Sequence, residues 1–143
     1  TETVPKTKVG GWMLIADESG GTEPIRRRII EMPEDLERTE LRDSASGFIA
    51  YVPVGSIAKG EALITTGAGK TTPCAICHGA ELRGLGPVPA LAGRSPSYIV
   101  RQLYDMQHGM RNGQWAALMK PVVAELSEDD MVAIAAYTAS LAP

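Results

Sequence analysis

Two cysteines and a histidine carry the most specific chemistry in this sequence. Cys74 and Cys77 are the only 2 cysteines in 143 residues, and His78 follows directly. Residues three apart on a helical turn point the same way. Both thiols can therefore bond to the two vinyl groups at one edge of a porphyrin, with the His78 imidazole beneath the ring as an iron ligand. The C-x-x-C-H spacing predicts one covalently attached haem c.

Two other chemistries could use the same side chains. A thioredoxin-like dithiol needs a strand–helix context, but Thr71-Thr72-Pro73 precedes the pair and no parallel-strand pattern surrounds it. A zinc site could draw on Cys74, Cys77, His78 and His108. Adjacent Cys77 and His78 would struggle to reach one tetrahedral ion, and no second ligand pair has the usual spacing. Haem attachment is the preferred interpretation.

The iron needs a second axial ligand. Met106 and Met131 fall within predicted helices, where packing into the core is the better interpretation. Met110 lies on a predicted loop and is an alternative, as is His108. Met119 also lies on a predicted loop, from which a thioether can swing over the far face of the ring. Thioether ligation raises the reduction potential, and two filled axial positions suit electron transfer rather than catalysis.

Three helices are predicted after residue 55, from residues that favour helix ends. They cover residues 57–66, 96–108 and about 128–141. Ser56 and Ser95 are the expected N-caps of the first two, and Ser127 with Asp130 resembles a capping box for the third. Gly67 is expected to end the first helix.

Residues 1–55 have a different pattern. Short apolar or β-branched runs separated by turn sequences are typical of a small antiparallel element. The runs cover residues 12–16, 25–30 and 48–52, and residues 33–38 could form one helical turn. We therefore expect a β-rich N-terminal extension over residues 1–55 and a separate domain over residues 56–143.

Composition excludes several classes of protein. Hydrophobic residues make up 44% and the net charge is −3, so no basic footprint for nucleic acid is present. The basic run Arg26-Arg27-Arg28 falls in an expected strand, where neighbours point to opposite faces, so a solvated edge is favoured over a docking patch. No run approaches the roughly 20 apolar residues of a transmembrane helix. Any export signal is expected to have been removed or to lie further upstream.

From about Ser56 to its end, the sequence resembles the class I cytochromes c, in particular the short bacterial c4/c5-like type seen in each half of cytochrome c4. The resemblance rests on Lys59–Leu63, Cys74–Gly79, Pro89–Arg94, Tyr98 with Gln102-Leu103, Leu118–Pro121, Leu126–Asp130 and Ala135–Tyr137. It implies an all-α cytochrome c fold around the haem. It also implies an electron carrier rather than an enzyme. Residues 1–55 lie outside the resemblance and could link this unit to a further haem domain.

The resemblance also implies roles for single residues. Met119 matches the family's Met-x-Pro pattern and is the implied sixth ligand. The Pro89 carbonyl would accept a hydrogen bond from His78, and Arg94 would bind a haem propionate. Further candidates for the propionate edge, each of which could instead pack or face solvent, are Tyr98, Gln102 and Trp115.

Packing expectations complete the domain. Gly60 and Tyr137 are expected to mark a close crossing of the first and last helices. The core and the haem pocket are expected to draw on Leu82, Leu85, Leu91, Ile99, Leu103, Val122, Leu126 and Ile134.

The sequence therefore predicts a single-electron carrier with one His/Met haem c. The resemblance implies a periplasmic location, with a periplasmic dehydrogenase as donor and an oxidase or other cytochrome as acceptor. One alternative is a haem enzyme or gas sensor with a labile sixth ligand. Another is a docking subunit of a dehydrogenase complex, anchored through residues 1–55.

Overall fold

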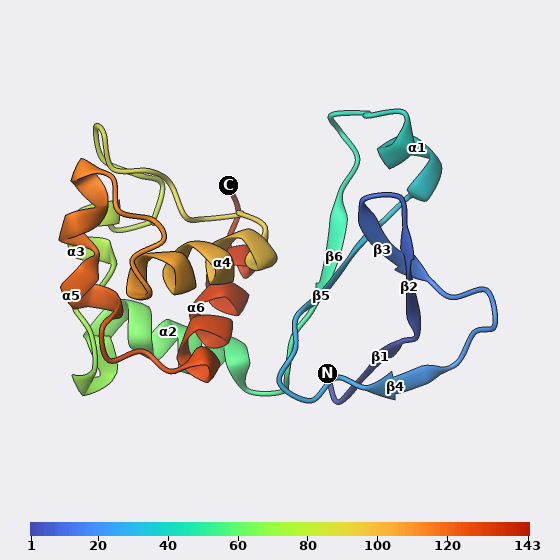
Figure 1. The fold of residues 1–143 in the computed structure, drawn as a ribbon, viewed down its shortest axis with the longest axis horizontal. Helices are drawn as coiled ribbons and strands as arrows, with labels where there is room; N and C mark the ends of the chain where they lie inside the picture. Colours follow the sequence, from blue (N-terminus) through green and yellow to red (C-terminus); the bar gives the residue numbers. More distant parts are fainter. The chain divides into compact units, whose positions relative to one another are not determined.

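The computed structural model describes residues 1–143, which divide into two compact units, Thr1–Val54 and Gly55–Pro143. Strands build the first unit and helices build the second (Figure 1). The division lies one residue before the boundary expected from the sequence. Each unit buries its own set of apolar side chains.

The strand unit consists of three two-stranded antiparallel sheets. Its elements are β1 (Thr3–Pro5), β2 (Thr7–Gly10), β3 (Met13–Ala16), β4 (Thr22–Pro24), β5 (Ile30–Pro33), α1 (Leu36–Glu40) and β6 (Phe48–Tyr51). β1 pairs with β4, β2 with β3, and β5 with β6. The small core contains Val4, Ile25, Ile30 and Met32, with Leu14 and Tyr51 packed against it.

The strand expected over residues 25–30 is wrong. Residues 26–28 form a turn, with Arg26 at a φ of +55°, and β5 begins only at Ile30. The Arg28 side chain donates to the carbonyls of Pro24 and Ile25 at 2.8 and 3.1 Å. These bonds satisfy backbone groups that a strand would have paired, so the turn is favoured. The alternation argument for the three arginines therefore does not apply.

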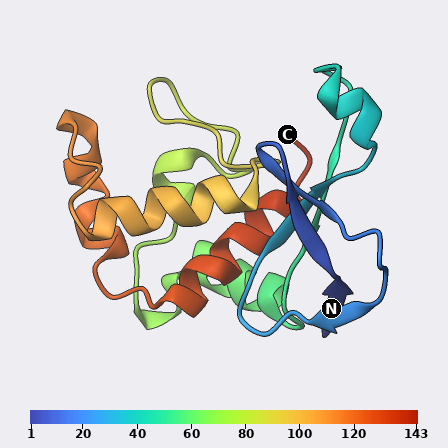
Figure 2. The ribbon, with the colours of Figure 1, turned by 45° about the vertical axis from the view of Figure 1, so that its right-hand side comes forward.

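The helical unit contains five α-helices and two short 3-10 helices. They are α2 (Ser56–Thr66), η1 (Gly67–Gly69), α3 (Ala75–His78), α4 (Pro96–Gln107), η2 (Gln114–Leu118), α5 (Lys120–Val123) and α6 (Glu128–Ser140). α6 packs against both α2 and α4 (Figure 2). None of the helices has the length and apolar content needed to cross a bilayer.

Most of the expected helix ends are confirmed. The Ser95 hydroxyl accepts from the Tyr98 N–H, and Ser127 and Asp130 form a reciprocal capping box. Gly67 ends α2 in the left-handed conformation. The expected N-cap at Ser56 is wrong, because Gly55 takes that position and Ser56 is buried in the first turn.

The crossing of α2 and α6 depends on Gly60. A Cβ atom there would lie 2.8 Å from the Cβ of Tyr137, so the two helix backbones approach at the expected pair. Five of the eight expected core residues are buried: Leu82, Ile99, Leu103, Leu126 and Ile134. Leu91 and Val122 are half-buried. Leu85 is 64% exposed, because it lies in a tight turn paired only with Val88.

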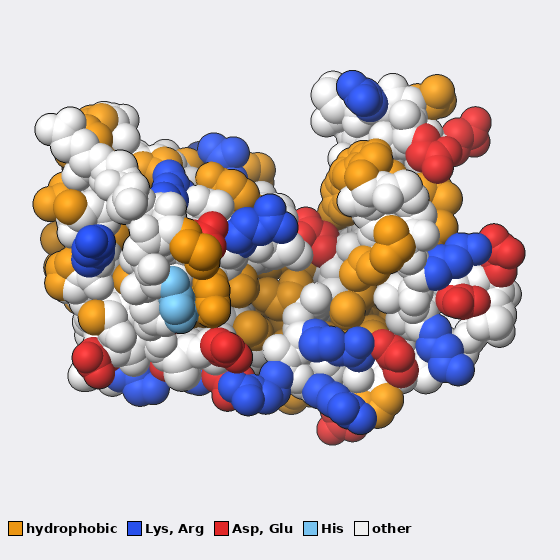
Figure 3. All heavy atoms as spheres, viewed as in Figure 1, with side chains coloured by type: hydrophobic (Ala, Val, Ile, Leu, Met, Phe, Trp, Pro, Cys, Tyr) orange, Lys and Arg blue, Asp and Glu red, His pale blue; other side chains and the backbone are white.

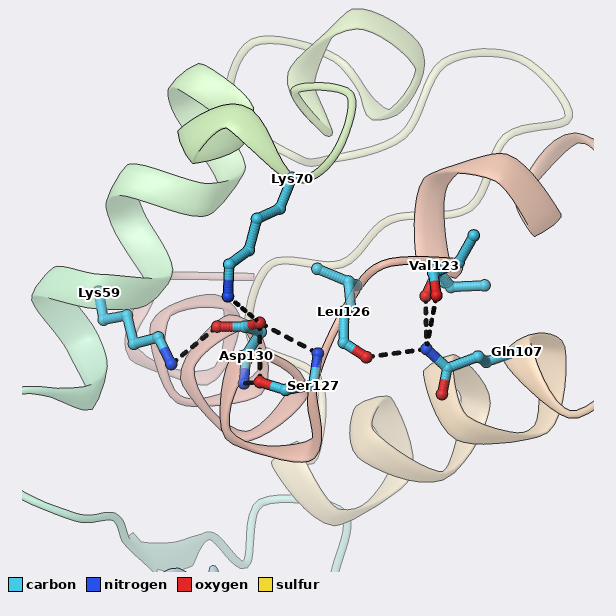
Figure 4. A network of polar contacts seen from close by, with 8 residues as sticks. Lys59, Lys70, Gln107, Val123, Leu126, Ser127 and Asp130 are labelled. Atoms are coloured by element: carbon cyan, nitrogen blue, oxygen red, sulfur yellow. Dashed lines mark hydrogen bonds and ion pairs between the residues drawn. The ribbon is translucent and has the colours of Figure 1, made fainter.

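Asp130 ties three segments of the helical unit together. Its side chain is completely buried, and its two carboxylate oxygens lie 2.7 Å from Lys59 Nζ and 2.8 Å from Lys70 Nζ (Figure 4). The same carboxylate accepts from the Ser127 N–H and hydroxyl. Burial opposes its ionisation, but these hydrogen bonds outweigh burial and hold the pKa of Asp130 well below its usual range.

Candidate functional site

Cys74 and Cys77 lie on one helical turn. The N–H groups of Cys77 and His78 both donate to the Cys74 carbonyl, at 3.2 and 2.9 Å. The Cys74 N–H donates to the Ile64 carbonyl at 2.9 Å, which ties the turn to the end of α2. Both thiols are free, and burial raises the pKa of Cys74 to about 11. The two sulfurs are thus carried by one turn with the imidazole next in line.

His78 is buried and held by a backbone carbonyl. Its Nδ1 atom lies 2.7 Å from the Pro89 carbonyl oxygen, and only 6% of the residue is exposed. Because a carbonyl can only accept, Nδ1 carries the proton and Nε2 keeps its lone pair. A carbonyl partner of this kind fixes the tautomer and orientation of a metal-ligating histidine and raises its basicity.

Backbone hydrogen bonds hold the segment after His78 in place. Gly84 N–H donates to the His78 carbonyl at 2.8 Å, and the Leu82 carbonyl accepts from Leu91 and Ala92 at 2.8 and 3.1 Å. Gly84 has a φ of +87°, and a Cβ there would lie 2.8 Å from the Val88 carbonyl oxygen. These constraints set the position of the Pro89 carbonyl relative to the imidazole.

Met119 lies between two helical turns. Its N–H donates to Ala116 and its carbonyl accepts from Val123, both at 3.0 Å. The residue is half-buried at the junction of η2 and α5. Met119 thus lies outside both helical segments, as expected, but the connection is a single residue. Pro121 stands in the first turn of α5, where a proline without an N–H is tolerated.

The other candidates for the sixth ligand differ in setting. Met110 is 63% exposed, whereas Met131 is buried within α6 and Met106 is half-buried within α4. His108 is exposed, its Nδ1 atom lies 2.9 Å from the Tyr104 carbonyl, and its ring stacks on the Tyr104 ring at 3.9 Å. Met131 is thus a core residue, and His108 is already engaged with its own helix.

The residues expected at a propionate edge are exposed. Arg94, Tyr98 and Trp115 all present their side chains to solvent. Gln102 is half-buried, and its side-chain oxygen accepts from the Arg111 guanidinium. Three of these four side chains thus face solvent, and the amide of the fourth is bound to a neighbouring arginine.

These residues fit a haem. The thiol pair supplies two covalent attachment points and His78 supplies a free Nε2, while Leu85, Trp115 and Leu118 are each 63–65% exposed. Apolar side chains also gather on the surface in the space-filling view (Figure 3). A porphyrin is a flat apolar ring that such side chains can cover. The zinc alternative lacks a ligand set, because no group of three or more His, Cys, Asp or Glu side chains is gathered for a metal.

Two polar side chains that bind the segment after Met119 were not predicted from the sequence. The Thr71 hydroxyl and the Gln107 amide both bind backbone carbonyls in the segment after Met119. Their partners lie 51 and 16–19 residues away in sequence, and a backbone carbonyl has no residue type. No sequence signal could have found them.

The two cysteines on one turn, the adjacent His78 and the surrounding helices fit a covalently attached haem. Comparisons with known proteins agree, although no family profile matches the chain. Cytochrome c-554(548) of Halomonas halodenitrificans is 40% identical over 75 residues, which cover 52% of this chain and 90% of that protein. The structure of Acidithiobacillus ferrooxidans cytochrome c4 has a TM-score of 0.56 at 31% identity, covering 61% of this chain and 50% of that one.

One relative is named for its partner. A protein of Stutzerimonas stutzeri named thiosulfate dehydrogenase electron acceptor is 40% identical over 65 residues, covering 44% of this chain and 29% of that protein. Cytochrome c4 of Pseudomonas aeruginosa is 36% identical over 75 residues, 52% of this chain and 36% of that one. The chain thus spans about a third of these longer relatives.

The chain belongs to the class I c-type cytochromes and is similar to cytochrome c4. Proteins of this family carry covalent haem c and transfer electrons, so the chain is an electron carrier and not an enzyme. The helical unit accordingly has the cytochrome c fold.

Proposed function

We propose that this chain is a periplasmic electron-transfer cytochrome with one His/Met haem. Cys74 and Cys77 attach the haem, and His78 and Met119 ligate the iron. The observation that carries the proposal is the 2.7 Å contact from His78 Nδ1 to the Pro89 carbonyl, because it leaves Nε2 free beside the thiol pair. When bound, the haem supplies a one-electron iron couple.

The protein groups suit that couple. The Pro89 carbonyl fixes the orientation of the His78 ring and raises its basicity as a ligand. A thioether opposite it favours the reduced iron and raises the potential. If His78 and Met119 both bind the iron, no position would be left for substrate or gas, which would favour a carrier over a haem enzyme or sensor.

The setting of Met119 supports its role over the alternatives. Backbone hydrogen bonds hold its N–H and its carbonyl. Met110 is exposed on an irregular segment, and His108 is stacked on Tyr104. A ligand whose backbone is already held loses less conformational entropy when it binds. Arg94 would offer a guanidinium fork to a haem propionate, and Tyr98 and Trp115 are the further candidates for this role.

Replacement of single candidates tests the ligand. The oxidised wild-type protein is expected to show the far-red iron–thioether band and to resist carbon monoxide when reduced. Met119→Leu should abolish the band and admit carbon monoxide. Met110→Leu and His108→Ala are the controls and should leave both unchanged. If Met110→Leu removes the band instead, the assignment is wrong. Rapid carbon monoxide binding by the wild type would favour the sensor.

A periplasmic dehydrogenase is the proposed electron donor, with an oxidase or other cytochrome as acceptor. The relative named as a thiosulfate dehydrogenase electron acceptor supports this class of donor. The periplasm is proposed because haem is attached to C-x-x-C-H sequences outside the cytoplasmic membrane of bacteria. Reduction of the purified cytochrome by such a dehydrogenase, followed by stopped-flow absorbance, tests the pairing, and no reduction would contradict it.

Residues 1–54 are proposed as a β-rich docking extension. Val9, Trp12 and Leu41 are each more than 70% exposed, so apolar side chains of this unit are available for contact with a partner. Residues 55–143 expressed alone should keep the haem spectrum but be reduced more slowly by the partner. Equal rates for the two chains would remove the docking role.

A further inference from the structure

Four backbone carbonyls after Met119, those of Val122, Val123, Ala124 and Leu126, accept hydrogen bonds from side chains. α5 has only four residues, so its last carbonyls cannot all be bonded within the helix. The chain then runs through Ala124 to Leu126 before α6 begins. Val123, the last residue of α5, is completely buried.

Gln107 satisfies most of these carbonyls. Its Nε2 atom lies 2.7 Å from the Val123 carbonyl oxygen and 2.8 Å from that of Leu126, with the Ala124 carbonyl at 3.4 Å (Figure 4). Because all three neighbours are acceptors, the atom among them must be the amide nitrogen, which has two protons to donate. One side chain at the end of α4 thereby clamps the segment between α5 and α6.

Thr71 holds the same segment from elsewhere in the fold. Its hydroxyl donates to the Val122 carbonyl at 2.6 Å. Thr71 lies three residues before Cys74, and its own N–H is bonded to the Gly67 carbonyl at 3.1 Å. The segment that follows Met119 is therefore tied to the stretch that leads into the two cysteines.

We propose that Gln107 and Thr71 are positioning residues that hold the Met119 thioether at the haem iron. The connection is short, because the Val123 N–H donates to the Met119 carbonyl at 3.0 Å and the Val123 carbonyl is bound by Gln107. Loss of the hydrogen bonds from either side chain would loosen the turn that contains Met119, so its thioether would leave the iron more often. This inference rests on the proposed ligation by Met119.

Imidazole binding to the oxidised holoprotein measures how often the thioether leaves, because imidazole competes for the same position. Gln107→Met keeps the shape of the side chain but removes both donors. Its apparent imidazole affinity should rise at least tenfold, as expected when two buried hydrogen bonds are lost, and the far-red band should weaken. Thr71→Val should act in the same direction, and Thr71→Ser should restore wild-type binding.

Thr65→Val is the matched control. The Thr65 hydroxyl donates to the Glu61 carbonyl at 2.8 Å within α2, so it has the same bond type without a link to Met119. It should leave imidazole affinity unchanged. If the far-red band is present in the wild type and lost in Met119→Leu, the ligand assignment stands. Unchanged imidazole affinity in both Gln107→Met and Thr71→Val would then overturn this inference but not the ligand assignment. A band that survives Met119→Leu overturns the ligand assignment and the inference together. If Gln107→Met does not fold, the Thr71→Val and Thr71→Ser pair decides.

Discussion

A Cβ atom on Gly60 would lie 2.0 Å from the carbonyl oxygen of Ala133 on the facing helix. Backbone cannot move away as a flexible side chain can, so α2 and α6 would have to separate. Gly60→Ala is expected to lower the free energy of unfolding by about 3 kcal/mol, the upper part of the range for overpacking. Denaturant unfolding of the holoprotein followed by circular dichroism measures this loss.

Gly113→Ala is the matched control for that variant. A Cβ at Gly113 meets nothing within 4 Å, and its φ of −57° suits any residue. Its stability should stay within about 0.5 kcal/mol of wild type. A Gly60→Ala protein as stable as the Gly113→Ala protein would show that the two helices can move apart without cost.

Asp130 is expected to be the most costly acidic side chain to neutralise. Asp130→Asn leaves Lys59 and Lys70 facing a buried neutral amide, so we expect a loss of about 3 kcal/mol in the free energy of unfolding. Glu128→Gln, an exposed change in the same helix turn, should cost less than about 0.5 kcal/mol. Similar losses in both would argue against the buried network.

Acid should remove the contribution of Asp130. The pKa of Asp130 is held below its ordinary value of 3.8 in the folded protein, so the unfolded chain takes up the proton first. The stabilisation is complete above about pH 5 and is lost as the pH falls below 4. In that range, the free energy of unfolding of the wild type should fall by about 1.4 kcal/mol per pH unit more than that of Asp130→Asn. Parallel pH profiles of the two proteins would refute this.

Gly84 is expected to influence the haem potential through Pro89. Gly84→Ala puts a Cβ 3.2 Å from the Pro89 carbonyl carbon at a strained φ, so the carbonyl should shift from His78. A weaker hydrogen bond from His78 to Pro89 makes the imidazole less basic, so the reduction potential of the haem should rise by tens of millivolts. A rise of about 59 mV corresponds to a tenfold change in the equilibrium constant for one-electron reduction. Gly86 also has a positive φ, but a Cβ there would meet no atom within 4 Å. Gly86→Ala should therefore leave the reduction potential, measured by redox titration, unchanged.

Each cysteine is expected to hold the haem by itself. Cys74→Ala and Cys77→Ala should each keep one thioether, and both should retain haem on a denaturing gel stained for peroxidase activity. The double variant should lose its haem to acidified acetone, because ligation by His78 and Met119 is reversible. Complete haem loss from either single variant would mean that one sulfur carries the attachment.

Local features were predictable from the sequence because their partners are close in the chain. The thiol pair and His78 share one helical turn, and the caps at Ser95 and Ser127 bind N–H groups three residues on. The turn at residues 26–28 was missed because β-branched neighbours suggested a strand, while the Arg28 side chain supplies the turn's hydrogen bonds in its place.

The sequence by itself determined the chemistry of this protein, because the C-x-x-C-H spacing restricts what two thiols and an imidazole can bind. Only the tertiary structure decided how the segment that follows Met119 is held. Thr71, Gln107 and Met119 come from three separate segments, and their connections run through backbone carbonyls that every residue has. Such contacts exist only once α4, α5 and the stretch before Cys74 have packed together.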